Sequence, residues 1–392
     1  MKNNKLLTLV SVAVSSVVAS MAVNAAEVEF TGYARYGVDY QAEEAQYVQM
    51  GSMGRTLGRL GNELNGGEFQ FSTSFEANEG QQWDIVLMID NWAHSDWNSN
   101  GGIDLKKIYA GVKNVIPAQP DMYIWAGRDF HQRYTQSLND YFWMTHDGQG
   151  AGFRNLTFDF AKLDMGFVEK VLTAEDGLSL GEGNGNYALT SKLHSIDVGY
   201  GILDLYANFG FASEKANKDD RENKAWQVAA TMNIDGNYKA VLRYSDGADD
   251  SVLQRTDDLQ VIYTSFEGRY NIGNPVSMEY MVSYKEFAGL DAKDWSNNGK
   301  LRDKEYAAIV RPMFTWNETF STWLEAGYAV EEYNDGDETK GWKATLSQNI
   351  TAGSMPWSRP TLRFYATVGD VDKPQGVKVD TLTLGAMFEA WW

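Results

Sequence analysis

The sequence predicts an all-β fold, an 18-stranded antiparallel transmembrane β-barrel. Three observations support this. Aromatic residues make up 13% of the 392 residues, yet the mean hydropathy is negative at −0.41. Apolar residues recur at every second position, and the alternating segments number eighteen. A barrel strand faces lipid only at alternate positions, so a polar but aromatic-rich chain is typical of this class.

The last segment shows the alternation most clearly. Its even positions are all apolar: Leu382, Leu384, Ala386, Phe388, Ala390 and Trp392. Among the odd positions from 381 to 391, only Met387 and Trp391 are apolar. Period two is the pattern of a strand with one apolar face. We therefore expect Trp392 at the membrane interface and Trp391 in the lumen.

The same pattern recurs along the chain and predicts the position of each strand. We expect strands at 27–39, 67–78, 81–92, 103–115, 120–130, 151–160, 162–171, 186–199, 203–213, 225–234, 238–246, 257–271, 276–288, 304–316, 319–333, 340–352, 360–370 and 379–392. Short connections at 233–237, 272–275 and 316–319 are expected on the periplasmic side. Longer polar ones, such as 216–224 and 289–303, are expected outside. No linker interrupts the pattern, so residues 26–392 are predicted to form a single barrel domain.

The first 25 residues are predicted to be a signal peptide. Lys2 and Lys5 precede an apolar run over 6–22, and small residues at 23–25 suggest cleavage after Ala25. Cleavage would move the net charge from −19 to −21. Nucleic-acid binding needs basic surface, so this balance argues against it.

Other structural classes are also excluded by composition. The chain has no cysteine, which rules out a disulfide framework. After the signal peptide, no stretch approaches 18 consecutive apolar residues, so helical membrane spans are not expected. The predicted location is the bacterial outer membrane.

The sequence offers no motif for catalysis, a cofactor or a metal. The four histidines have no metal-ligand spacing, and the glycine-rich run at 181–186 is not followed by a helix signal. An enzyme stays an alternative only because some pair of acids could have glycosidase spacing. A soluble glycan-binding protein is another alternative. Divalent cations at the acidic stretches 216–222 and 331–338 are a minority interpretation.

Aromatic side chains that face a pore need a partner that is both flat and soluble. A pyranose ring has a C–H face that stacks on aromatic rings and a hydroxyl rim that hydrogen-bonds. By analogy with aromatic pairs, each contact would contribute about 0.5–1.5 kcal/mol. A series of weak sites suits conduction, because a tightly held solute does not leave.

Several motifs resemble the maltoporin family of LamB-type sugar porins, in the same order along the whole chain. They are "TGYARYG" at 31–37, "GRLGNE" at 58–63, "IWAGRDFHQRY" at 124–134, "RPMFTW" at 311–316, "WSRPTLRFYAT" at 357–367 and the terminal "FEAWW". The resemblance implies a homotrimer of 18-stranded barrels. It also implies an inward constriction loop and a lumenal aromatic track, the greasy slide, flanked by charged residues.

The resemblance implies five residues of the aromatic slide: Tyr33, Trp97, Phe142, Trp357 and Trp391. Phe142 stands where the family has tyrosine, and Trp97 resembles a tryptophan contributed by a neighbouring subunit.

Two slide positions depart from the family pattern. One aromatic position falls on Gly67 or Glu68, and another falls on Ala240. Tyr238 and Tyr244 have the parity of Ala240 and are considered as substitutes.

The polar track implied by the resemblance comprises Arg35, Arg59, Lys106, Arg133 and Asp140. Lys106 replaces an arginine, which keeps the charge but loses bidentate hydrogen bonding, and an acidic position falls on Thr135. Independently of any family, the polar and aromatic segment 130–152 is long enough to suggest a functional loop, here the constriction.

These inferences predict a passive porin for maltose and maltodextrins. Expected partners are outer-membrane lipid and lipopolysaccharide, further copies of the chain and a periplasmic sugar-binding protein. A porin for another sugar, such as sucrose or aryl-β-glucosides, and a general diffusion porin are the alternatives.

Overall fold

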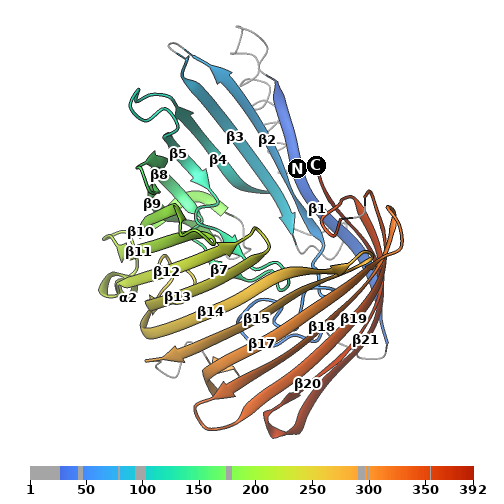
Figure 1. The fold of residues 1–392 in the computed structure, drawn as a ribbon. Coiled ribbons are helices and arrows are strands. Elements are labelled where there is room, and N and C mark those ends of the chain that lie inside the picture. Colours follow the sequence, from blue (N-terminus) through green and yellow to red (C-terminus); the bar gives the residue numbers. More distant parts are fainter. Residues whose placement is uncertain are drawn as a thin grey trace, which may run out of the picture.

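The chain folds into a closed antiparallel β-barrel (Figure 1). The computed structural model describes residues 27–42, 47–77, 80–92, 103–173, 179–289, 296–297, 300–353 and 355–392. The predicted signal peptide lies outside these ranges. Within the described residues, eighteen strands form the wall. No helix there is both long and apolar enough to cross a membrane.

The wall strands follow one another around the barrel in chain order. They are β1 (Val28–Gln41), β2 (Gly66–Glu76), β3 (Gln82–Trp92), β4 (Asp104–Lys113), β5 (Tyr123–Asp129), β8 (Gly148–Thr157), β9 (Lys162–Thr173), β10 (Ser179–Asp197), β11 (Ile202–Ala212), β12 (Ala225–Ile234), β13 (Tyr238–Ala248), β14 (Arg255–Gly273), β15 (Val276–Ala288), β17 (Lys300–Thr315), β18 (Phe320–Tyr333), β19 (Glu338–Thr351), β20 (Thr361–Lys373) and β21 (Val377–Trp391). The predicted fold class is confirmed, and each predicted segment overlaps one of these strands.

The shorter elements are not part of this wall. β6 (Tyr134–Thr135) and β7 (Phe142–Met144) pair with each other in a separate two-stranded sheet. β16 (Ser296–Asn297) pairs with the start of β17. A short helix α2 (Lys218–Glu222) and a 3-10 turn (Pro374–Gly376) occupy two connections.

β10 begins seven residues before the predicted strand, in the glycine-rich run that sequence patterning treats as a loop. This run stays paired to β9, but its register shifts twice between Ser179 and Tyr187. Gly181 and Gly185 have positive φ angles of 76° and 85°. Glycine adopts such angles without a steric penalty. The strand therefore continues through bulges that interrupt period two.

The barrel closes where β1 pairs with β21, from Tyr33 opposite Trp391 to Gln41 opposite Thr383. Trp392 continues this pairing, because its amide and carbonyl both bond Gly32. Its indole covers Gly32, where an added Cβ would lie 2.6 Å from the ring. The C-terminal indole therefore packs on the outer face, as the alternation predicts.

The two faces of β21 separate as expected for a membrane strand. Leu382, Leu384 and Phe388 are exposed on the outer face, whereas Thr383 and Glu389 are buried inside. The predicted short turns are also present. Between β12 and β13, Asp235 and Gly236 both have positive φ, which suits a tight hairpin turn.

Two long segments fold into the barrel interior. The predicted constriction loop runs from Phe130 to Asp147, because β8 already begins at Gly148. It packs Tyr141, Trp143 and Met144 against Tyr206 and Tyr263 of the wall.

The second inward segment, residues 47–65, is absent from the sequence-based prediction. Its buried Leu57 and Leu60 pack against β17, β18 and β20. Lys343 of β19 donates hydrogen bonds to the carbonyls of Gly58 and Leu60 at 2.6 and 2.7 Å. The two inward segments also contact each other, since the Arg59 amide donates to the Leu138 carbonyl at 3.0 Å. Both segments also contact β1, because Arg35 bonds the Leu64 carbonyl at 2.9 Å and the Asp140 carboxylate at 3.1 Å.

Candidate solute path through the barrel

Aromatic rings lie side by side on the inner face where β1 meets β21. Tyr33 stacks on Trp391 with ring centroids 6.4 Å apart and planes inclined by 26°. On its other side Tyr33 stacks on Trp92 of β3, at 5.9 Å and 29°. Tyr33 and Trp391, two of the residues expected in the slide, are therefore in contact, and Trp92 adds a third ring. Trp92 shares the parity of Asp84 and Asp90, a signal that could have placed it in the lumen.

A cluster of arginines lies next to these rings and converges on Asp140 at the tip of the constriction loop. Guanidinium nitrogens of Arg35, Arg55 and Arg59 lie 3.1, 3.1 and 3.4 Å from the Asp140 carboxylate. Asp140 itself has a φ of +54°, a strained conformation that persists only where the surroundings enforce it. Three predicted polar-track residues are thus brought together, and Arg55 joins them.

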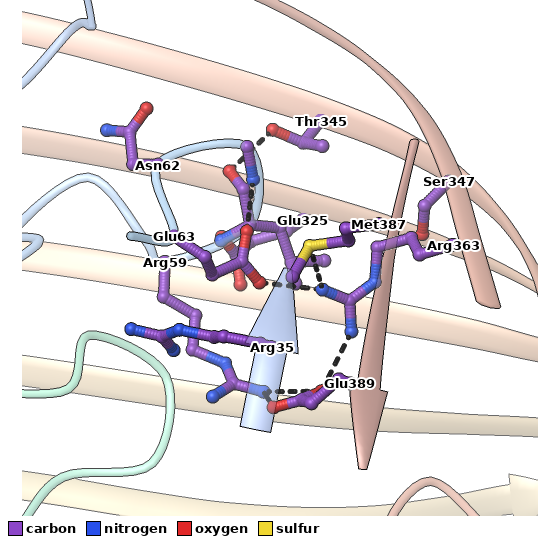
Figure 2. Close-up of polar contacts among 12 residues, drawn as sticks. Arg35, Arg59, Asn62, Glu63, Glu325, Thr345, Ser347, Arg363, Met387 and Glu389 are labelled. Carbon is purple, nitrogen blue, oxygen red and sulfur yellow. Dashed lines mark hydrogen bonds and ion pairs between the residues drawn. The ribbon is translucent and has the colours of Figure 1, made fainter. Parts of the chain in front are cut away.

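A second carboxylate, Glu389 of β21, joins the arginine cluster to the aromatic rings. Figure 2 shows its bonds to the arginines Arg59 and Arg363. The Tyr33 hydroxyl donates to Glu389 at 2.8 Å. Arg59, Arg359 and Arg363 donate to the same carboxylate at 3.0, 2.6 and 3.3 Å. Glu389 is 1% exposed, so these bonds replace water around its charge.

The ion-pair network extends to the second inward segment, since Arg363 also bonds Glu63 at 2.6 Å. Figure 2 shows Arg35, Arg59, Glu63, Arg363 and Glu389 converging from the inward segment and the wall. Three members of this cluster were not predicted from the sequence: Glu389, Arg359 and Arg363. Glu389 could have been placed in the lumen from the sequence, because it lies two residues before Trp391 and therefore on the same face of the last strand.

A family model described as LamB porin matches residues 28–392. The chain belongs to the LamB porin family. Two curated relatives are named Maltoporin, from Vibrio cholerae serotype O1 strains El Tor Inaba N16961 and Classical Ogawa 395. Each is 27% identical over 98% of this chain and at least 98% of the relative.

Among solved structures, Pseudomonas aeruginosa OccK3 (OpdO) has a TM-score of 0.52 at 10% identity. The match covers 96% of this chain and 99% of that one, which shows likeness of fold. This LamB-family porin is therefore an outer-membrane β-barrel channel.

In this LamB-family porin, Phe142 and Arg133 lie on the constriction loop. The Arg133 guanidinium carbon lies 3.4 Å from the ring centroid of Phe130 and 5.1 Å from that of Phe142. Arg133 is ion-paired with Asp147 at the end of the loop. Phe142 is 39% exposed, so part of its ring stays accessible. These contacts hold Arg133 away from the Asp140 cluster.

Lys106 also lies apart from that cluster. Its ammonium pairs with Asp104 at 2.6 Å and with Asp90 at 3.6 Å. Asp90 is opposite Glu68 in the β2–β3 register, and Glu68 is opposite Tyr33 in the β1–β2 register. Lys106 therefore lies farther around the wall from Tyr33, beyond β2.

Trp357 lies in the turn between β19 and β20 and is 51% exposed. Its ring faces Arg269 of β14, whose guanidinium carbon is 4.3 Å from the centroid. Arg359, two residues later, is 4.2 Å from the Trp391 ring. The turn thus connects the two tryptophans through Arg359 rather than by ring contact. Trp97 lies outside the described residues.

The substitutes considered for the missing aromatic at Ala240 are wrong. Tyr238, Ala240 and Tyr244 share the face of Leu242, which is 56% exposed on the barrel exterior. The intervening Val241 and Arg243 are buried inside. These tyrosines face outward and cannot extend a lumenal track.

Two histidines fix the ends of the constriction loop, which lies outside the spanning strands. His131 Nε2 is 2.6 Å from the Thr190 hydroxyl, and the Val252 amide donates to His146 Nε2 at 3.3 Å. Burial lowers the pKa of His131 to about 3, with the Arg154 charge adding to this effect. Burial, helped by His131 and Arg243, lowers the pKa of His146 well below its usual value. Both rings are therefore neutral at pH 7.

We expect the constriction loop to loosen in acid. A depressed folded-state pKa means that full stability is present above pH 6.5 and is lost as the pH falls toward 3. For His131 the loss is on the order of 3 kcal/mol at pH 4. Protonation of His146 would also break its bond from Val252. Single-channel recordings should show more current noise at pH 4 than at pH 7.

A double variant, His131→Gln with His146→Gln, should lose most of this pH response. His194→Gln is the control, because that ring pairs with Asp164 on the wall. An equal response to acid in the double variant and the wild type would contradict the prediction.

Proposed function

We propose that this LamB-family porin lets maltose and maltodextrins cross the outer membrane by passive diffusion. The observation that carries the proposal is the stacked pair Tyr33 and Trp391 beside the guanidinium groups of Arg35 and Arg59. Flat rings next to hydrogen-bond donors match the two surfaces of a pyranose. The names of the curated relatives support the same solute class.

The path moves solute by exchanging weak contacts. Sugar rings stack on Tyr33 and Trp391, while hydroxyls exchange hydrogen bonds with the Asp140 cluster. Each stacking contact is worth about 0.5–1.5 kcal/mol, so a few contacts give affinities near millimolar, about −4 kcal/mol. Such binding is weak enough for release. Phe142, Trp357 and Trp97 are proposed to extend the slide, and Lys106 and Arg133 the polar track.

The proposal includes partners as well as solute. The exposed apolar outer face would contact outer-membrane lipid and lipopolysaccharide, and we propose a homotrimer as the assembled form. Residues 1–25 would direct export and be removed after Ala25. A periplasmic sugar-binding protein would collect the solute.

The decisive measurement is current block in a planar bilayer. The purified porin is titrated with maltohexaose and, separately, with sucrose. Saturable block by maltohexaose at a concentration at least tenfold below that of sucrose is the expected result. Stronger block by sucrose would overturn the maltodextrin assignment, and no block by either sugar would indicate a general diffusion porin.

A porin for another sugar is the second candidate. The observation that favours it is the lack of an aromatic side chain at Glu68, a lumenal position next to Tyr33 where the family resemblance implies a ring. The comparison between maltohexaose and sucrose separates the two candidates directly.

A further inference from the structure

Strand β2 has no ring at the lumenal positions next to Tyr33. The strand registers place Glu68 opposite Tyr33 and Gly66 opposite Arg35. Glu68 and Gly66 therefore share the inner face with Tyr33 and Arg35. The aromatic that the family resemblance implies on this strand is absent, which leaves a gap in the slide beside Tyr33.

Trp92 of the next strand fills this gap. It lies opposite Gly66 in the β2–β3 register. A Cβ added to Gly66 would come within 2.5 Å of the Trp92 ring, so the indole lies directly over the glycine. Gly66 also has a φ of +154°, which other residues rarely adopt. The missing side chain on β2 is thus the condition that lets an indole from β3 reach Tyr33.

The three rings form one surface across four adjacent strands. Tyr33 is inclined by 29° to Trp92 and by 26° to Trp391, with centroid separations near 6 Å. A pyranose chain that lies along nearly parallel rings can keep its C–H faces in contact with each in turn. Trp92 lies on the outer side of Tyr33, because its partner Gly66 is opposite Arg35, two residues farther along the outward-running strand β1.

Polar groups suited to sugar hydroxyls flank Trp92. The Arg35 guanidinium carbon is 5.2 Å from its ring centroid, and this arginine also bonds Asp140. The Glu68 side chain is partly exposed, and its carboxylate makes no hydrogen bond or ion pair with the residues that the structure describes. An unpaired carboxylate can accept two hydroxyl hydrogens, while the guanidinium donates to hydroxyl oxygens.

We propose that Trp92, with Glu68 and Arg35, forms a pyranose-binding subsite on the outer side of Tyr33 that replaces the ring missing from β2. This inference rests on the proposed sugar-porin function. The ligand of this subsite would be an α-linked glucose oligomer that is long enough to reach beyond Tyr33 and Trp391. The subsite makes the affinity depend on chain length, since a disaccharide can bind at Tyr33 and Trp391 alone.

The test compares variants of the full-length porin in planar bilayers with maltohexaose and maltose as probes. Trp92→Ala and Trp92→Leu should raise the half-blocking concentration of maltohexaose about three- to tenfold, the equivalent of one stacking contact. The change for maltose should stay below twofold. Trp92→Phe should restore block by maltohexaose to within about twofold of wild type. Trp342→Ala is the matched control, because Trp342 is exposed on the outer face of β19.

Conductance without sugar separates a lost contact from a deformed pore. We expect it to be unchanged in the control Trp342→Ala, because that indole lies on the outer face of the barrel. The inference is overturned if maltohexaose blocks Trp92→Ala and Trp92→Leu as strongly as it blocks the wild type, while it blocks Trp391→Ala poorly. It is also overturned if the Trp92 substitutions raise the half-blocking concentrations of maltose and maltohexaose by the same factor. If the wild type is not blocked by maltohexaose, the proposed function itself fails.

Discussion

Replacing Glu389 by glutamine should destabilise the barrel by about 3–5 kcal/mol, because removing one partner of a buried ion pair leaves uncompensated charge. Glu389 accepts hydrogen bonds from Tyr33, Arg59, Arg359 and Arg363 in a site closed to water. In the variant, Arg59 still pairs with Asp140 and Arg363 still pairs with Glu63. Arg359 loses its ion-pair partner. Urea unfolding in detergent, followed by tryptophan fluorescence, measures the change.

Glu286→Gln is the control for this measurement. Glu286 also accepts a tyrosine hydroxyl, from Tyr284, but the pair lies on the outer face near the rim. Its replacement should cost less than about 1 kcal/mol, as for exposed polar pairs. Equal unfolding curves for Glu389→Gln and wild type would show that the arginines find other partners.

Replacing Asp140 by asparagine should change both the selectivity and the affinity of the channel. The substitution removes the one carboxylate shared by Arg35, Arg55 and Arg59, so the constriction gains one positive charge. Chloride should become more permeant relative to potassium, and the zero-current potential in a KCl gradient reports this shift. Half-block by maltohexaose should require at least about tenfold more sugar, because a charge-assisted acceptor is lost and the loop tip is released.

Asp335→Asn provides the control for Asp140→Asn. Asp335 lies in an outer turn and pairs with Lys300, so the same loss of charge occurs far from the constriction. It should leave both the zero-current potential and the sugar block within experimental error. If the two variants behave alike, the charge at the loop tip does not control passage.

The strand pattern of this porin was readable from the sequence because each wall strand faces two different solvents. On β21 the sequence separates Leu382, Leu384 and Phe388 from Thr383 and Glu389, and the structure exposes the first set and buries the second. The prediction was less accurate for β10, because glycines and bulges break the period there.

The second inward segment could not be predicted from periodicity. Residues 47–65 have no regular structure, and their position depends on partners far away in the chain. The Leu60 amide bonds Glu325 at 2.7 Å, and Lys343 bonds the carbonyls of the same segment. Such contacts become visible only when strands β17 to β20 are folded around the segment.

Alternation of side chains in the sequence determined the eighteen strands, the inner and outer faces of the last of them, and the inward orientation of Trp391. Alternation cannot determine which inner side chains meet, because that depends on register, on neighbouring strands and on segments that fold into the lumen. Only the tertiary structure brought Trp92 over Gly66 and three arginines onto Asp140. It also showed Tyr238 and Tyr244 on the outer face. Period two assigns a residue to one of two faces, whereas a binding site requires the closed barrel.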